Sequence, residues 1–148
     1  MAQRIKKILI QRSNPMIINY RMNAGHIHMD HWVHGEEGGG RNIGEACHLY
    51  DLFTFFTDAR VEKIQACSLR PSTEYFSASD NFVVILRFED GSLANLTYTA
   101  LGSSNHMKEQ MHIYSDGKVF AMEDDYKKLD IYGSNAKAFK TATKDKGH

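Results

Sequence analysis

Two side chains that can transfer protons stand three residues apart in the segment Gly44-Glu45-Ala46-Cys47-His48. On a helix, residues at this spacing share a face, so the Glu45 carboxylate can lie beside the His48 imidazole. Such a carboxylate orients the ring and raises its basicity, which suits a general base near neutral pH. Two structural interpretations stay open. Glu45 follows Asn42 at capping-box spacing, and His48 could be a half-buried histidine with satisfied hydrogen bonds.

A run of glycines precedes this pair. Gly38, Gly40 and Gly44 approach the spacing of a dinucleotide fingerprint, in which backbone N–H groups at a helix start bind phosphate. The context argues against that interpretation, because the preceding residues are polar and include two adjacent glutamates. The glycines could instead permit the positive φ angles of a tight turn. We favour a third interpretation, in which Gly39 and Gly40 let a large ligand approach the backbone closely.

Four histidines gather just before the glycines, at His26, His28, His31 and His34. Their spacing matches no common zinc site and no cysteine is near, so we predict no metal here. We expect a polar loop that contacts a substrate, with Trp32, the only tryptophan, as an apolar or stacking wall.

The totals limit the class of protein. A length of 148 residues suggests one domain, and 18 basic residues balance 18 acidic ones. Balanced charge argues against nucleic acid or an anionic membrane as partner, and no apolar run approaches membrane-spanning length. Cys47 and Cys67 show neither metal nor redox spacing. We predict that both are reduced thiols in the core of a soluble, cytoplasmic protein.

The elements that must position these residues follow from periodicity. We predict an amphipathic helix over residues 4–11, a strand over 16–22, and a helix over 43–56 whose buried stripe includes Leu49, Phe53 and Phe56. Between the strand and the second helix lies a polar loop of roughly twenty residues, a length that is usually functional.

The second half of the chain has the alternation of β-strands. Asp90-Gly91 and Asp116-Gly117 each predict a hairpin turn. The predicted strands span residues 61–69, 82–89, 93–100, 109–115, 118–123 and 128–132. We expect an α+β domain with an open, mostly antiparallel β-sheet and helices on one face. The polar tail over 141–148 is expected to fray.

Several of these segments together resemble a known family. They are Asn19-Tyr20-Arg21-Met22-Asn23-Ala24-Gly25, Asp30-His31-Trp32, Gly38-Gly39-Gly40, Gly44 to Asp51, Phe88-Glu89-Asp90-Gly91-Ser92 and Leu96 to Gly102. The combination is similar to the C-terminal domain of the Gfo/Idh/MocA oxidoreductases, the family of glucose–fructose oxidoreductase and inositol dehydrogenase. The resemblance covers about residues 5–147.

The resemblance implies an open-sheet domain that supplies substrate contacts and a homo-oligomer interface through its sheet face. It implies NAD or NADP as cofactor, bound mainly by a Rossmann domain absent from this chain. Sugars, nucleotide sugars or cyclitols would be the substrates, oxidised or reduced by hydride transfer. His48 falls on the family's proton-transfer histidine. Asn23, His31, Trp32 and Arg41 would contact the sugar, and Gly39 and Gly40 would lie against substrate and nicotinamide.

The chain also departs from the family pattern. Gly-Glu-x-Cys-His replaces the usual Asp-x-Gly-x-His, as in a subgroup of the family, so Glu45 either orients His48 or caps the helix. We expect residues 1–14 to be the last helix of a missing Rossmann domain or a linker. Residues 15–148 would be the substrate-binding and oligomerisation domain, truncated at its C-terminus and inactive alone. The alternative is a non-catalytic module that binds a carbohydrate or a protein.

Overall fold

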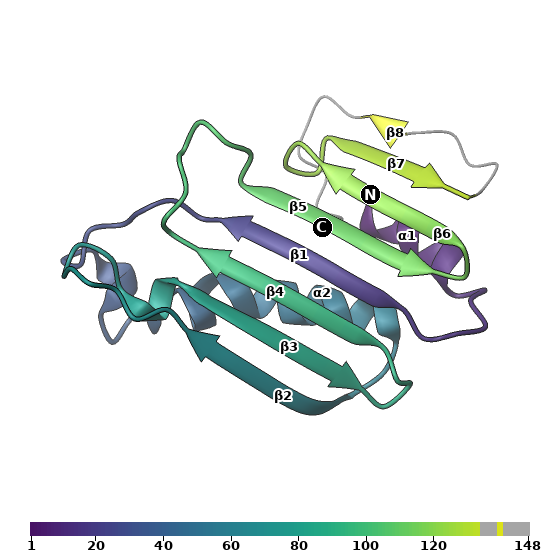
Figure 1. Ribbon diagram of the computed structural model, residues 1–148, viewed down its shortest axis with the longest axis horizontal. Helices are drawn as coiled ribbons and strands as arrows, with labels where there is room; N and C mark the ends of the chain where they lie inside the picture. Colours follow the sequence, from purple (N-terminus) through teal and green to yellow (C-terminus); the bar gives the residue numbers. More distant parts are fainter. Residues whose placement is uncertain (134–138, 141–148) are drawn as a thin grey trace.

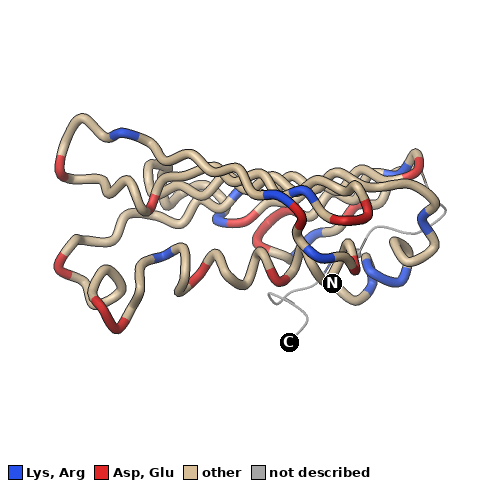
Figure 2. The backbone as a smooth tube through the Cα atoms, turned by 90° about the horizontal axis from the view of Figure 1, so that it is seen from below, with Lys and Arg blue, Asp and Glu red and all other residues tan. Residues whose placement is uncertain are grey.

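The fold is two layers, an eight-stranded sheet with its helices on one face (Figure 1). The structure, a computed structural model, describes residues 1–133 and 139–140. Seen from the side, the helical segments lie beneath the sheet (Figure 2). The helical elements are α1 (Ala2–Leu9), the short turns η1 (Trp32–His34) and η3 (Ala78–Asp80), the π-helical turn η2 (Asn42–Ala46) and α2 (Cys47–Thr57).

The sheet has the order β2-β3-β4-β1-β5-β6-β7-β8. Its strands are β1 (Ile17–Asn23), β2 (Val61–Ser68), β3 (Phe82–Phe88), β4 (Leu93–Thr99), β5 (Glu109–Ser115), β6 (Lys118–Glu123), β7 (Lys128–Tyr132) and β8 (Phe139–Lys140). Every neighbouring pair is antiparallel except β1 and β4, which are parallel. The predicted α+β class, the open antiparallel sheet and the placement of the helices on one face are confirmed.

The core lies between the sheet and the helices. On β3 and β4 alternate residues face the helices and are buried, as the period of two requires. Phe53 and Phe56 of α2 are fully buried, and the Phe53 ring meets the Tyr20 ring edge-on at 5.9 Å between centroids. Burial of each large apolar side chain contributes roughly 1.5–3 kcal/mol. The buried stripe predicted for the second helix is therefore observed.

Helix α1 packs into this same core through Ile5 and Leu9, both nearly fully buried. Beyond its end, Arg12 donates hydrogen bonds to the Thr57 carbonyl at 2.6 Å and to Asp90 at 2.5 Å. These contacts connect the first helix to the end of α2 and to the β3–β4 turn. Whether residues 1–14 are also the last helix of a preceding Rossmann domain stays a prediction.

The prediction that both cysteines lie in the core is wrong, because Cys47 and Cys67 are exposed. Ala46 and Leu49 face the core from α2 and its preceding turn, and Cys47 is rotated about 100° from Ala46 and about 160° from Leu49 on the helix, so it lies on the solvent side. Cys67 lies on the edge strand β2, all of whose residues are exposed. The predicted tail over 141–148 lies outside the described residues.

Candidate functional site

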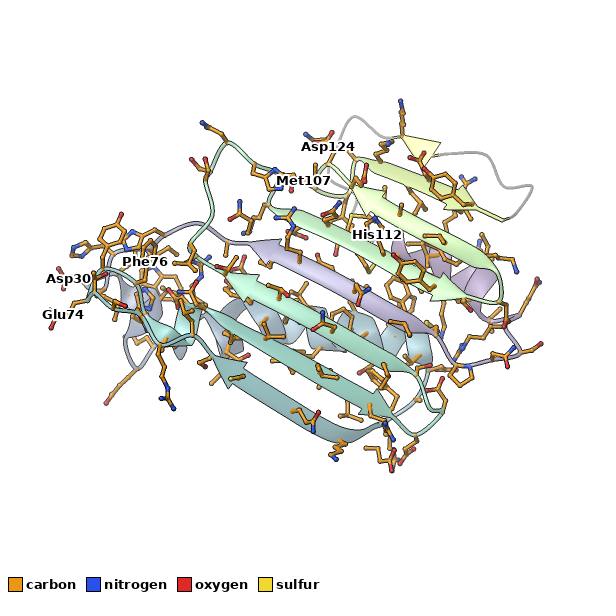
Figure 3. All side chains as sticks on the ribbon, viewed as in Figure 1. Asp30, Glu74, Phe76, Met107, His112 and Asp124 are labelled. Carbon is orange, nitrogen blue, oxygen red and sulfur yellow. The ribbon has the colours of Figure 1, made fainter. Side chains whose placement is uncertain are left out.

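Three loops meet at one end of the sheet. Strands β1 and β4 are parallel, so the loops over residues 24–41 and 100–108 leave the sheet at the same end (Figure 1). The loop over 69–81 joins them: the Asn81 Oδ1 accepts hydrogen bonds from the Thr99 hydroxyl and the Ala100 N–H, both at 2.9 Å. His26 stacks on Tyr75 of that loop with ring centroids 4.0 Å apart. Figure 3 shows Asp30, Glu74 and Phe76 together at this end.

Glu45 lies in the π-helical turn that precedes α2 and reaches toward the sheet. Its Oε1 accepts a hydrogen bond from Lys108 Nζ at 2.6 Å, and its Oε2 accepts one from Arg41 at 3.2 Å. The Tyr98 hydroxyl also donates to Oε2. π-Helical turns are rare and frequently accompany functional sites. The π-helical turn directs the Glu45 carboxylate toward the sheet. There the carboxylate connects Arg41, at the end of the 24–41 loop, with strand β4 and with the segment before β5.

These contacts fix the charge state of the carboxylate. Burial by itself would raise the pKa of Glu45, but the hydrogen bonds from Lys108, Tyr98 and Arg41 outweigh it and hold the pKa at about 2. Burial and the nearby Glu45 charge raise the pKa of Tyr98, so its phenol remains a neutral donor. Glu45 is therefore ionised at neutral pH, where it can position other groups but is unsuited to accept a proton.

Arg41 is almost completely buried, and its hydrogen bonds connect the end of the 24–41 loop to the residues that follow β1. Its guanidinium donates to the Gly25 carbonyl at 2.6 Å, to the Ala24 carbonyl at 3.0 Å and to Glu45. It also lies 5.4 Å from the centre of the Tyr98 ring. All these contacts are internal, so the observed role of Arg41 is to shape the loop. Its predicted contact with a sugar stays a prediction.

Asn23 fastens the second loop in a similar way. Its side-chain amide donates to the Ser103 carbonyl at 2.8 Å, and its backbone N–H donates to the Lys108 carbonyl at 2.7 Å. Gly102 lies so close that a Cβ there would meet the Asn23 Oδ1 at 2.0 Å. Asn23 therefore holds the 100–108 loop at the end of β1, and its predicted substrate contact is not tested by these packing interactions.

His48 lies in the first turn of α2 with its side chain exposed. No hydrogen bond or ion pair joins it to Glu45 in the part of the chain that the structure describes. Glu45 turns toward the sheet, whereas His48 lies on the exposed side of α2. The capping box is not formed either, because Asn42 lies inside the π-helical turn, whose N-cap is Arg41, and the Glu45 carboxylate is directed to Lys108, Arg41 and Tyr98. The imidazole is free to meet a ligand.

The remaining predicted residues lie on the exposed part of the glycine and histidine loop. His31 caps the short turn η1 through its ring nitrogen, and Trp32 is 64% exposed with its ring near that of His31. Gly39 and Gly40 adopt positive φ angles of 63° and 76°, which glycine accommodates without strain. The glycine run therefore does serve a tight turn. Close approach of a ligand to Gly39 and Gly40 stays a prediction.

The four histidines do not converge on a metal. Within the described residues, no group of three or more histidine, cysteine or acidic side chains could hold an ion. His34 instead lies 3.6 Å from Asp80, with both side chains buried. This pair joins the histidine loop to the 69–81 loop, and the sequence analysis did not identify it.

The sequence analysis also missed Tyr98 and Lys108. A signal existed for Tyr98, since it belongs to the apolar face of a predicted strand and a buried phenol needs a hydrogen-bond partner. For Lys108 no local signal exists, because it lies in a polar loop 63 residues from Glu45.

No described helix is long and apolar enough to cross a membrane.

Comparison with known proteins identifies the domain type. A family model described as the GFO/IDH/MocA C-terminal domain matches residues 15–138. A search of curated protein sequences found no match.

Solved structures share the fold at low sequence identity. The UDP-N-acetylglucosamine 3-dehydrogenase GnnA from Acidithiobacillus ferrooxidans is 16% identical with a TM-score of 0.71, over 95% of this chain and 42% of that one. The WlbA dehydrogenase from Bordetella pertussis, in complex with NADH and UDP-GlcNAcA, is 18% identical with a TM-score of 0.68, over 86% and 42%. An inositol dehydrogenase homolog from Azotobacter vinelandii, complexed with NADH and myo-inositol, is 9% identical with a TM-score of 0.63, over 94% and 39%. This chain thus spans about two fifths of their length.

Proposed function

This chain belongs to the GFO/IDH/MocA family through its C-terminal domain, and from that premise we propose that it is the substrate-binding domain of an NAD(P)-dependent oxidoreductase. The substrate would be a sugar, a nucleotide sugar or a cyclitol with a reacting hydroxyl group. Two of the similar structures hold NADH, one with UDP-GlcNAcA and one with myo-inositol. The cofactor would be bound mainly by residues outside this chain.

The observation that carries the proposal is the position of His48. Its imidazole is exposed on the first turn of α2, directly after the π-helical turn that anchors Glu45 to the sheet. In the oxidative direction His48 takes the hydroxyl proton of the substrate while the C–O bond becomes a carbonyl. In the reverse direction its imidazolium returns that proton. The nicotinamide, when bound, supplies the hydride acceptor or donor.

The surroundings suit this role. Apart from Gly40 and its two chain neighbours, no heavy atom of the described residues lies within 4 Å of the position that a Cβ at Gly40 would occupy, so a flat ring has room to approach the backbone there. Trp32 and His31 offer exposed rings on the same loop for contact with a sugar. Arg41 and Asn23 would act by holding the two loops in place. Glu45 would act as a positioning residue, not as the base.

We also propose that the enzyme is a cytoplasmic homo-oligomer assembled through the sheet face that has no helices. Large apolar side chains are exposed on this face at Ile17, Val83, Ile85 and Tyr114. Scattered single apolar residues are normal on a surface, but four on one sheet face, spread over strands β3, β1 and β5, suit an interface.

Turnover of the full-length enzyme tests the catalytic assignment. His48→Ala should lower kcat about 10²- to 10⁴-fold, the usual effect of losing a general acid or base, with a smaller change in KM. Arg60→Ala is the control, because Arg60 is an exposed basic residue just before β2, at the end of the sheet away from the three loops. A near-normal kcat for His48→Ala would contradict the proposal and favour a non-catalytic binding module.

A further inference from the structure

We propose that Lys108 forms a binding site for an anionic group of the substrate, a carboxylate or a phosphate. This inference rests on the proposed function, since it names the substrate class that the same end of the domain selects. It begins from the hydrogen-bonded cluster of Arg41, Glu45, Tyr98 and Lys108.

The charges of this cluster do not balance. Glu45 carries one negative charge, whereas Arg41 and Lys108 carry two positive charges, and the Tyr98 phenol is neutral. Arg41 already provides Glu45 with a buried cation. The Tyr98 hydroxyl provides a further hydrogen-bond donor to the same carboxylate. The single negative charge of Glu45 is thus already paired with one cation before Lys108 is counted. Lys108 therefore leaves a surplus positive charge, which a ligand anion would neutralise.

The surplus charge is at the surface. The Arg41 side chain is 3% exposed, whereas the Lys108 side chain is 37% exposed. A lysine ammonium has three N–H donors, and the structure shows one hydrogen bond from Nζ, to Glu45. Two donors remain directed away from that contact. They suit the oxygen atoms of a carboxylate or phosphate, for which lysine is an established point-charge partner.

The ammonium is also held in place before a ligand arrives. The hydrogen bond to Glu45 fixes the end of the side chain, and the Lys108 carbonyl accepts a hydrogen bond from the Asn23 N–H at 2.7 Å. The Arg21 guanidinium donates to the preceding Met107 carbonyl at 3.3 Å. A fixed lysine loses less rotamer freedom on binding than a free one, so more of the ion-pair attraction appears as affinity.

Equilibrium binding of three probes to the 148-residue chain tests the site. D-Glucuronate carries a carboxylate, UDP carries phosphates, and D-glucose is the neutral reference. We expect the protein to bind one of the two anions at least about 10-fold more tightly than glucose, the usual range for a hydrogen bond to a charged group. Tighter binding of glucuronate identifies a sugar acid as the source of the anion, and tighter binding of UDP identifies a nucleotide sugar.

Lys108→Met keeps the length of the side chain and removes the charge. It should abolish the preference for the anion and leave the binding of glucose unchanged. Lys127→Met is the matched control, because Lys127 is similarly exposed, at 39%, and lies 3.7 Å from a carboxylate, Asp124, in the turn between β6 and β7. Equal binding of all three probes, or an anion preference that survives Lys108→Met, would overturn the inference.

The two proposals can fail separately. The binding measurement needs no turnover, so the anion preference can be found even if His48→Ala keeps its kcat. In that case the oxidoreductase assignment of His48 fails and the anion site stands. If His48→Ala loses kcat but Lys108→Met keeps the preference, the reverse holds.

Discussion

Lys108 Nζ and Glu45 Oε1 are 2.6 Å apart although 63 residues separate them in the chain. This contact connects the π-helical turn before α2 with the segment that enters β5. It helps to keep Glu45 ionised, and with the hydrogen bonds from Arg41 and Tyr98 it gives the carboxylate three donors from three parts of the fold. Glu45 therefore stabilises the arrangement around His48. We expect substitutions of Glu45 to change the free energy of unfolding more directly than the proton-transfer step.

The stability of the domain should depend on the ionisation of Glu45. Its pKa is about 2 in the folded protein, against an ordinary value of 4.5. Between these values the unfolded chain binds more protons than the folded one, so the free energy of unfolding rises with pH. The contribution of Glu45 is fully present above about pH 4.5 and is lost as pH falls toward 2. Urea unfolding at several pH values measures this slope.

Glu45→Gln is the matched variant, since glutamine keeps the size of the side chain but does not titrate. The variant should be less stable than the wild type at pH 7, and its stability should fall less steeply between pH 4.5 and 2. A slope equal to that of the wild type would show that Glu45 is not the titrating group.

Arg41→Ala should destabilise the domain by about 2–4 kcal/mol, because it leaves two carbonyls and the Glu45 carboxylate without a buried donor. Arg41→Lys should recover little of this loss, since an ammonium cannot reproduce the geometry of the guanidinium toward several acceptors. Arg60→Ala, an exposed arginine just before β2, should stay within about 0.5 kcal/mol of the wild type. Chemical denaturation measures all three, and equal effects of Arg41→Ala and Arg60→Ala would contradict the stabilising role of the buried Arg41 contacts.

Gly38 and Gly40 should differ in their tolerance of alanine. A Cβ at Gly38 would lie 2.4 Å from the backbone of Val33, so Gly38→Ala must displace the η1 turn. Gly40→Ala meets open space and bears only the strain of its positive φ, about 1 kcal/mol. We therefore expect a clearly larger drop in Tm for Gly38→Ala. The reverse order would show that the loop is packed differently.

Helix α1 should contribute to the stability of this domain. Ile5→Ala removes a side chain that is 1% exposed and should cost about 2–4 kcal/mol of unfolding free energy. Ile10→Ala changes the same residue type at a position that is 67% exposed, and it should have little effect. Similar urea midpoints for the two variants would show that α1 is not packed on the core in solution.

The parts of this structure that could be predicted from sequence are those with a local pattern. The alternation of apolar residues in β3 and β4 predicts their buried faces, because side chains point to opposite sides of a strand in turn. The stripe of Leu49, Phe53 and Phe56 predicts the buried side of α2 for the corresponding helical reason. Asp90-Gly91 and Asp116-Gly117 predict the hairpins through their turn chemistry. The motif around His48 indicates the family.

The tertiary structure alone decided which distant residues meet. No local pattern encodes the insertion of β1 between β4 and β5, yet that strand order brings the 24–41 and 100–108 loops to one end. It gives Glu45 the partners Lys108 and Tyr98 in place of His48, and it makes β2 an edge strand with Cys67 exposed. Periodicity reports which face of an element is buried, whereas the partners across that face depend on packing between segments far apart in the chain.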